Sequence, residues 1–396
     1  MTNTNPTWED RDEEFEIDDP REDEQVEGIS VNDFDGLVLA PSDWTVGTIY
    51  SQIGQQIDLD PEFQRRNVWS KKAKSKFIES IFLGVPIPQI LLSSRKDSRS
   101  RYLVLDGKQR LTTIKEFLNG KYDGGTRFKL RNLSVLDAEI GGQDWPQISK
   151  DEDWKDRFNN GVIRAAVLKG WENEEVLYEI FHRLNSGSVR LSPMELRMSL
   201  HPGPFLKHII NWTETIGPLH HLLRKKSPDP RMADVELSIR HLAFSDPEME
   251  YNGNLKLFLD NCSEKYNALY ENDGFENVIV ERLDAMNRAI ALGIDIFGEK
   301  RFCRKWLGEA YETRFNRALF DVLVGSLSNK EFYEWANSNK LKVEESFKLL
   351  FTEDNDFVRS VETTTKSVEN TSRRFEKWYG SVEQISGISI EIPSIQ

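Results

Sequence analysis

The stretch Tyr102–Leu118, with the sequence YLVLDGKQRLTTIKEFL, decides the fold of the first half of this chain. Leu103 and Leu105 alternate with other residues as in a short buried strand, and the turn dipeptide Asp106-Gly107 follows them. Apolar residues then return at helical spacing, at Leu111, Ile114, Phe117 and Leu118. The stretch therefore predicts a strand, a tight turn and an amphipathic helix.

The first turn of this helix would carry Lys108, Gln109 and Arg110. The free N–H groups and the positive dipole end of a helix attract anions, so two cations beside them favour a phosphate-bearing ligand. In the alternative interpretation, Lys108 and Arg110 are solvated and Asp106 only caps the helix. The pattern leaves both interpretations open.

The composition is that of a globular protein with a large core. The chain has 396 residues, of which 38% are hydrophobic, enough for about two domains. Its two cysteines, Cys262 and Cys303, show neither metal-ligand spacing nor a disulfide framework, which is typical of a reducing cytosol. No apolar run approaches the roughly 18 residues of a membrane span, and the acidic N-terminus does not resemble a signal peptide. We expect a soluble, cytoplasmic protein.

The charge distribution is more informative than the net charge of −14. Residues 1–61 hold 17 acidic and two basic side chains, whereas residues 62–131 hold six acidic and 17 basic ones. The remainder, 132–396, holds 43 acidic and 33 basic side chains. The opening stretch lies in the basic block, which indicates a nucleotide or nucleic-acid backbone as ligand, although a solvated basic surface is the simpler alternative.

We expect three segments along the chain. Dense like charge predicts a disordered acidic tail over residues 1–28, which we consider as a competitor for an anionic ligand or as a solubility tail. A mixed α/β domain follows over residues 29–200, with a strand near Leu37–Leu39, a helix over Thr45–Gln52 capped by Ser42, and a helix over Ser70–Leu83 with a basic outer face. Strand signals nearly vanish in residues 201–396, which predict a helical domain. The fold class is therefore α+β.

A second motif precedes the Ser70 helix. The sequence IDLDPEFQRRNVW over residues 57–69 places Gln64, Arg65 and Arg66 between the aromatic residues Phe63 and Trp69. Cations interleaved with aromatic rings grip phosphates and stack on bases. The alternative is that Phe63 and Trp69 are core residues and the arginines face water.

Four ordered segments carry a family resemblance: PEFQRRNVW, FIESIFLGVPIPQILL, YLVLDGKQRLTTIKEFLNG and FHRLNSGSVRLSPMELR. Together they resemble the N-terminal domain of the GmrSD type IV restriction endonucleases, a family related to the ParB and sulfiredoxin-like nucleotide-binding fold. The resemblance covers residues 40–200. It implies a domain that binds and hydrolyses a nucleoside triphosphate with Mg²⁺, in a bacterial system that restricts foreign DNA.

The family motif, usually written Asp-Gly-Gln-Gln-Arg, falls on residues 106–110, where Lys108 replaces the first Gln. The resemblance makes Asp106, Gln109 and Arg110 the catalytic candidates, with Asp106 orienting a metal or water and the other two gripping phosphates. The expected nucleotide- or phosphate-binding residues are Gln64, Arg65, Gly107, Lys108, Thr112 and Asn185. The expected nucleic-acid-binding residues are Arg65, Arg66 and Lys72. We predict no metal site built from protein ligands alone.

The remaining sequence narrows the chemistry. Asn185, in the polar turn of residues 183–187, is placed near the nucleotide by the resemblance, but an Asn that only stabilises its own turn is an equal alternative. The linker over residues 121–156 predicts a short hairpin and loops. No histidine follows His241, so an HNH-type nuclease cannot be built in the C-terminal half.

Two functions remain open. The first is a nucleoside triphosphatase of a restriction or anti-phage defence system. The second is a non-catalytic module that binds DNA through the same basic surface and recruits a partner, such as a nuclease or another defence protein. Binding of a nucleotide is the firmer expectation, because Lys108 changes the motif at a position that bears on hydrolysis.

Overall fold

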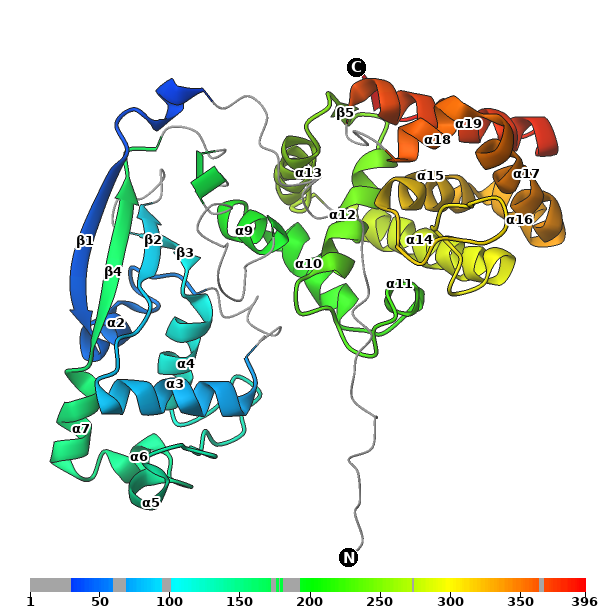
Figure 1. The fold of residues 1–396 in the computed structure, drawn as a ribbon. Helices are drawn as coiled ribbons and strands as arrows, with labels where there is room; N and C mark the ends of the chain where they lie inside the picture. The colour runs from blue at the N-terminus through cyan, green and yellow to red at the C-terminus, as the bar shows by residue number, and fades with distance from the viewer. Residues whose placement is uncertain are drawn as a thin grey trace, which may run out of the picture. The chain divides into compact units, whose positions relative to one another are not determined.

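The computed structural model describes residues 30–59, 69–94, 101–171, 176–177, 179–180, 193–272, 274–362 and 367–396. The predicted acidic tail and residues 60–68 of the cation-aromatic motif lie outside these residues, whereas Trp69 packs against the core beside Phe77, as the alternative interpretation expects for this residue. Within them, the contacts between Cα atoms divide the chain between Pro202 and Gly203 into an α+β unit and a helical unit. The expected α+β fold class is confirmed, with a small sheet and its helices followed by a mostly helical region (Figure 1).

The α+β unit is organised around a four-stranded sheet with the order β1-β4-β2-β3. These strands are β1 (Val38–Thr45), β2 (Ile90–Ser94), β3 (Tyr102–Asp106) and β4 (Val162–Lys169). β4 pairs antiparallel with β1 and parallel with β2, and β2 pairs antiparallel with β3. Asp106 therefore ends β3 opposite Leu91, at the edge of the sheet where β2 begins.

Strands β2, β3 and β4 contribute buried side chains to both faces of this sheet, since successive side chains of a strand point to opposite faces, whereas β1 is largely exposed. Val104 of β3 joins the larger core cluster with Ile90 and Leu92, whereas Leu103 and Leu105 join a smaller cluster. The larger cluster is covered by α2 (Val46–Gln52), α3 (Lys71–Leu83), α4 (Lys108–Leu118) and α7 (Glu152–Asn159). The smaller cluster receives Leu196 of α9 (Pro193–Leu200). The opening stretch is thus a buried strand leading into a buried helix.

Local signals placed α3 correctly. Ser70 is its N-cap and accepts a hydrogen bond from the N–H of Ala73 at 3.2 Å, and Gly84 ends it in the left-handed conformation with φ of 67°. The predicted cap at Ser42 is wrong, because pairing with β4 extends β1 to Thr45. Thr45 caps α2 instead and accepts a hydrogen bond from Thr48 N at 3.1 Å.

The region predicted as a short hairpin and loops contains an antiparallel bridge between Lys121 and Arg127, which fits the hairpin, and three short helices. They are α5 (Asp137–Ile140), α6 (Trp145–Ile148) and α7. Asp144 and Asp151 cap α6 and α7 with their side chains, and such helices of one or two turns are too short to give a periodic apolar pattern. The prediction of loops therefore failed where capping, and not amphipathicity, specifies the helix.

Two buried carboxylates, those of Glu79 and Glu116, join α3 to neighbouring segments. Glu79 accepts hydrogen bonds from three consecutive backbone N–H groups, those of Ser134, Val135 and Leu136, at 2.9, 2.7 and 2.9 Å. Burial alone would raise the pKa of Glu79, but these donors lower it below the ordinary value. Glu116 of α4 forms a buried ion pair with Lys74 of α3.

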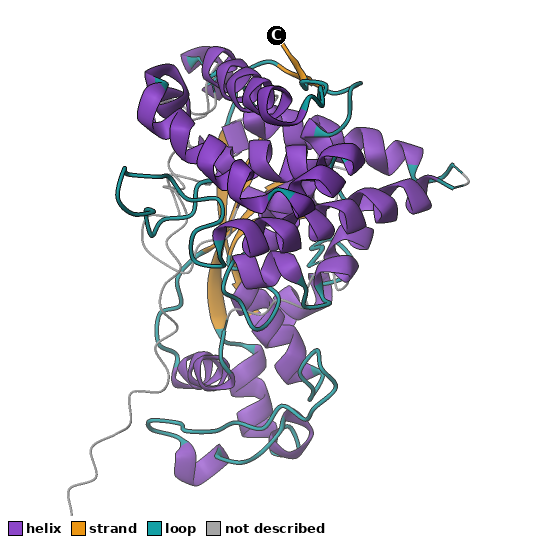
Figure 2. Cartoon of the chain, turned by 90° about the vertical axis from the view of Figure 1, so that its right-hand side faces the viewer, coloured by secondary structure: helices purple, strands orange, loops and turns teal. Residues whose placement is uncertain are grey.

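The helical unit contains α10 (Pro204–Thr213), α11 (Pro218–Leu222), α12 (Ala233–Phe244), α13 (Leu255–Leu269), α14 (Phe275–Phe297), α15 (Arg317–Ser328), α16 (Lys330–Ser338), α17 (Lys340–Glu353), α18 (Asn355–Glu362) and α19 (Val368–Ser386). Figure 2 shows that helices make up nearly all of its regular structure. The short strands β5 (Glu250–Tyr251) and β6 (Ser394–Ile395) pair in parallel. None of the helices in the described ranges is long and apolar enough to cross a membrane.

α12 and α15 form the centre of the helical unit, since almost every residue of both is buried. Arg240 of α12 donates two hydrogen bonds to the carboxylate of Asp321 on α15, at 2.6 and 2.7 Å. Trp378 of α19 is fully buried, whereas Trp306 and Trp335 are half-buried. His220, in α11, is held by Asp234 at 3.1 Å, so this histidine has a structural partner.

We predict that Glu79→Gln destabilises the α+β unit by about 1–3 kcal/mol, because an amide oxygen replaces a carboxylate that serves three donors. The pKa of Glu79 is lower in the folded protein than its ordinary value of 4.5, so the ionised carboxylate stabilises the fold fully above pH 4.5. This stabilisation is lost as the pH falls through the native pKa. The difference in unfolding midpoint between wild type and variant should be widest near pH 7 and should narrow below pH 4.5.

Thermal unfolding followed by circular dichroism from pH 3 to 8 measures this difference. Glu139→Gln is the matched control, since Glu139 is exposed and its variant should unfold like the wild type at every pH. A Glu79→Gln midpoint equal to wild type at pH 7 would show that the three hydrogen bonds contribute no net stability.

Candidate functional site

The turn between β3 and α4 requires glycine at position 107. Gly107 has φ of 98°, in the left-handed region that residues with a Cβ atom rarely adopt. A Cβ atom built there would lie 2.6 Å from Cγ2 of Ile90 and 3.4 Å from its Cα atom. Since Ile90 begins the neighbouring strand, Gly107 is the position that lets α4 start directly against the sheet.

The N-terminus of α4 has no side-chain cap. Gly107 is its N-cap residue and offers no side-chain oxygen, unlike Ser70 at the start of α3. The N–H groups of the first helical turn are the ones that lack partners within a helix. The alternative that Asp106 caps this helix is wrong, because Gly107 is the N-cap residue and no described side chain caps the helix; one oxygen of the Asp106 carboxylate accepts from Arg110 instead. The free N–H groups of this turn and the half-buried side chain of Lys108, its first residue, are together suited to binding an anion.

The side chain of Arg110 is buried in the α+β unit and hydrogen bonded there, so it is not the solvated cation of the alternative interpretation. It is 7% exposed, and its Nη2 donates to Asp106 Oδ2 at 2.5 Å. Its Nη1 donates to the carbonyl oxygens of Pro88 and Gln89, at 2.6 and 3.2 Å. The guanidinium therefore joins the end of β3, the first turn of α4 and the loop that leads into β2. This geometry makes Arg110 a positioning residue for the turn.

Gln109 carries the polar atom that best fits a missing ligand. Its Oε1 atom is buried and has no hydrogen-bond partner among the described residues. A buried acceptor without a donor costs about 1–3 kcal/mol, which a bound water or ligand would recover. The backbone oxygen of Gln109 is already used, because it accepts a hydrogen bond from Thr113 at 2.7 Å.

Asp106 and Lys108 complete the polar groups of the turn. The side chain of Asp106 is 31% exposed, and only its Oδ2 atom is hydrogen bonded to another described residue. The described ranges contain no group of three or more His, Cys, Asp or Glu side chains that could hold a metal ion. Mg²⁺ commonly binds through one or two carboxylates together with substrate phosphates, and the single carboxylate of Asp106 fits that arrangement.

Two of the other predicted site residues, Thr112 and Lys72, lie within the described ranges. Thr112, in the second turn of α4, is 3% exposed, and Lys72, in the first turn of α3, is exposed. No hydrogen bond brings either side chain to the α4 N-terminus in the described part of the chain. Gln64, Arg65, Arg66 and Asn185 lie outside the described residues, so their placement beside this turn stays a prediction.

Sequence reasoning missed the buried polar cluster between α3 and α4. Lys74 was expected on the basic outer face of α3, but it is 3% exposed and paired with Glu116. Burial raises the pKa of Glu116, although Lys74 opposes this, and burial followed by the charge of Glu116 raises the pKa of Tyr122 to about 12. The signal was present in the spacing, because Lys74 precedes Phe77 and Ile78 by three and four residues and so shares their apolar face.

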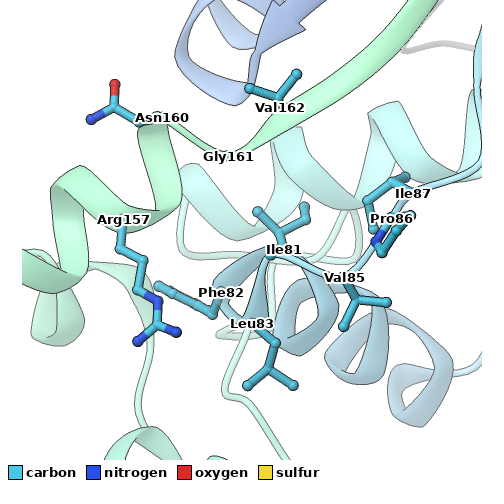
Figure 3. Close-up of a pocket in the computed structure, with 11 residues that line it drawn as sticks. Ile81, Phe82, Leu83, Val85, Pro86, Ile87, Arg157, Asn160, Gly161 and Val162 are labelled. Carbon is cyan, nitrogen blue, oxygen red and sulfur yellow. The ribbon is translucent and has the colours of Figure 1, made fainter.

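A cavity of about 450 Å³ lies near the same edge of the sheet, but it does not include the motif. Figure 3 shows that its walls come from the end of α3 and the following loop on one side and from α7 and the start of β4 on the other. Arg157 provides its one charged side chain, and most of its lining is aliphatic. It therefore lacks the chemistry that the turn at Gly107 provides.

The structure thus defines an α+β unit whose candidate site is a strand-turn-helix junction suited to anions. Residues 46–202 match the family model described as GmrSD restriction endonuclease, N-terminal domain. The match confirms the resemblance drawn from the four sequence motifs, and it covers the unit that contains the site. No curated protein and no solved structure matches the chain. The match indicates a restriction or defence-system domain; its relation to the ParB fold stays a prediction.

We predict that Arg110→Ala destabilises the α+β unit by about 2–4 kcal/mol, because it leaves Asp106 and the carbonyl groups of the loop without their donor. Arg110→Lys should recover only part of this loss, since one ammonium group cannot reach the carboxylate and both carbonyl oxygens together. Chemical denaturation measures the change. A variant with unchanged stability but lost ligand binding would assign Arg110 to the ligand instead of the fold.

Proposed function

We propose that residues 30–202 form a nucleoside triphosphate-binding domain of a bacterial restriction or anti-phage defence system. The observation that carries the proposal is the uncapped N-terminus of α4, which follows a glycine turn and holds Lys108 beside the unpaired Oε1 atom of Gln109. The family match over residues 46–202 supports the same proposal, because it covers a restriction endonuclease domain.

The phosphates would bind at the first turn of α4. The N–H groups of Lys108 and Gln109 would donate to phosphate oxygens, and the ammonium group of Lys108 would neutralise part of their charge. Asp106 would hold Mg²⁺ together with the phosphates, and the ion would supply further neutralisation of charge. Arg110 would act indirectly by keeping Asp106 and the loop before β2 in place.

Hydrolysis is the second step of the proposal. The Oε1 atom of Gln109 would accept a hydrogen bond from the attacking water and orient it, a role that a glutamine side chain can perform in phosphoryl transfer. A lysine at position 108 strengthens phosphate binding without itself activating water. Binding can therefore persist even where turnover is slow.

We predict that Lys108→Ala weakens binding of nucleoside triphosphate with Mg²⁺ by about tenfold or more without a change in thermal stability. Lys115→Ala is the matched control, because Lys115 is also half-buried but lies at the other end of α4. Isothermal titration calorimetry with each of the four common triphosphates measures the affinity. Binding that is absent for all four, or equal in both variants, would contradict the proposal.

Multiple-turnover phosphate release on the same proteins separates binding from hydrolysis. Gln109→Leu should retain binding within a few-fold and lose turnover. Wild type that binds a triphosphate but releases no phosphate, with or without DNA, would limit the function to binding.

The exposed cations of α3 favour a second function. Lys71, Lys72 and Lys76 are all exposed on this one helix, which suits contact with a nucleic-acid backbone. A DNA-binding module that recruits a partner would use this surface with no need for the turn at Gly107. DNA binding that falls steeply with salt, is weakened by Lys72→Ala with Lys76→Ala, and is unaffected by Lys108→Ala would favour the module.

A further inference from the structure

The helical unit contains a cavity of about 240 Å³ that none of the predicted functions uses. Its walls come from α12, α15 and α19, and the C-terminal segment Ile390–Pro393 closes one side. This segment leads into β6, which pairs with β5. The cavity is smaller than the roughly 300–1,000 Å³ typical of sites for drug-sized molecules, so it suits a ligand of one or two rings.

Aromatic side chains form one part of the wall. Phe244 of α12 and Phe375 of α19 lie with their ring centroids 5.4 Å apart, and Tyr379 follows Phe375 at 5.5 Å. All three rings line the cavity. A group of aromatic faces and edges of this kind favours a planar, polarisable ligand.

Unpaired polar atoms form another part of the wall. Ser328, the last residue of α15, has a buried Oγ atom without a hydrogen-bond partner among the described residues. The next residue, Asn329, uses Oδ1 to cap α16 through Phe332 N at 3.0 Å, which leaves its amide group to donate. The hydroxyl of Tyr379 lies directly over Gly325, where an added Cβ atom would come within 2.7 Å of it. The wall thus offers hydrogen-bond donors and acceptors from adjacent positions.

The charges around the cavity exclude a phosphate. The described lining contains two acidic residues, Asp321 and Glu391, and neither lysine nor arginine. Asp321 is already paired with Arg240, so it does not call for a cationic ligand either. His241 is neutral, because burial lowers its pKa to about 4. The ligand should therefore carry no charge.

We propose that this cavity binds one uncharged, planar heterocyclic ring of the nucleobase class, with one face against the aromatic group of Phe244 and Phe375 and its polar edge against Ser328 and Tyr379. The ring can belong to a free nucleoside or to a base in a single-stranded oligonucleotide. The inference is independent of triphosphate binding, which concerns the other unit of the chain.

Titration of the full-length protein with adenosine, guanosine, cytidine and thymidine, and with 12-nucleotide single strands, tests the inference. At least one nucleoside should bind, and Ser328→Ala and Tyr379→Phe should each weaken its binding about 3- to 10-fold. Ser372→Ala, which removes a half-buried hydroxyl of α19 that donates to Glu376 and does not line the cavity, is the control and should have no effect. Unchanged unfolding midpoints confirm that the variants fold.

The two sources of the ring give different results. If no free nucleoside binds but a single strand does, and both cavity variants weaken it, the site takes a base within a nucleic acid. If neither probe binds, or if Ser328→Ala and Tyr379→Phe bind like the wild type, the inference is wrong.

Discussion

The guanidinium of Arg110 is the interaction on which the candidate site depends. It contacts the carboxylate at the end of β3 and two carbonyl groups of the loop before β2, while its own backbone belongs to the first turn of α4. A chain that leaves a strand through a left-handed glycine has few local contacts to fix the direction of the following helix. The hydrogen bonds of the Arg110 side chain fix the direction of α4. This role explains why a charged residue is buried at the third position of the helix.

Buried charged side chains also link α3 to its neighbours, as Arg110 links the parts of the turn. Lys74 pairs with Glu116 of α4, and Glu79 collects three backbone N–H groups from residues 134–136. Buried charges are costly unless they are paired and hydrogen bonded, and here each one links α3 to a different segment. The candidate site is thus built on a frame of buried ion pairs and hydrogen bonds, while Lys108, Gln109 and Asp106 keep polar groups that bind no other described residue. The polar groups of Lys108, Gln109 and Asp106 are the main reason to place a ligand at the turn, because other buried charges near it are used to hold the fold.

Much of the fold could be predicted because local physics specified it. The apolar alternation in β3, the Ser70 cap and the Gly84 stop all follow from backbone preferences within a few residues. The prediction of a helix cap at Ser42 failed because β1 continues through this residue to Thr45. That extension depends on pairing with β4, which begins 120 residues further along the chain, and no local signal reveals it.

The candidate site was predicted less completely than the fold. The residues of the motif were identified from sequence, but their roles depend on long-range contacts that spacing does not encode. Arg110 was expected to grip phosphates, yet its partners include two carbonyl groups more than twenty residues earlier in the chain. The unpaired state of Gln109 Oε1 and the burial of Lys74 likewise follow from packing alone.

The proposed site binds an anion through the N–H groups of the first turn of α4, which no described side chain caps. Amide chemical shifts of ¹⁵N-labelled protein, recorded during titration with inorganic triphosphate, test this binding most directly because the probe carries no base. The amides of Lys108, Gln109 and Arg110 should show saturable shifts that exceed those in the rest of α4. Shifts confined to other basic segments, with these three amides unchanged, would contradict anion binding at this site.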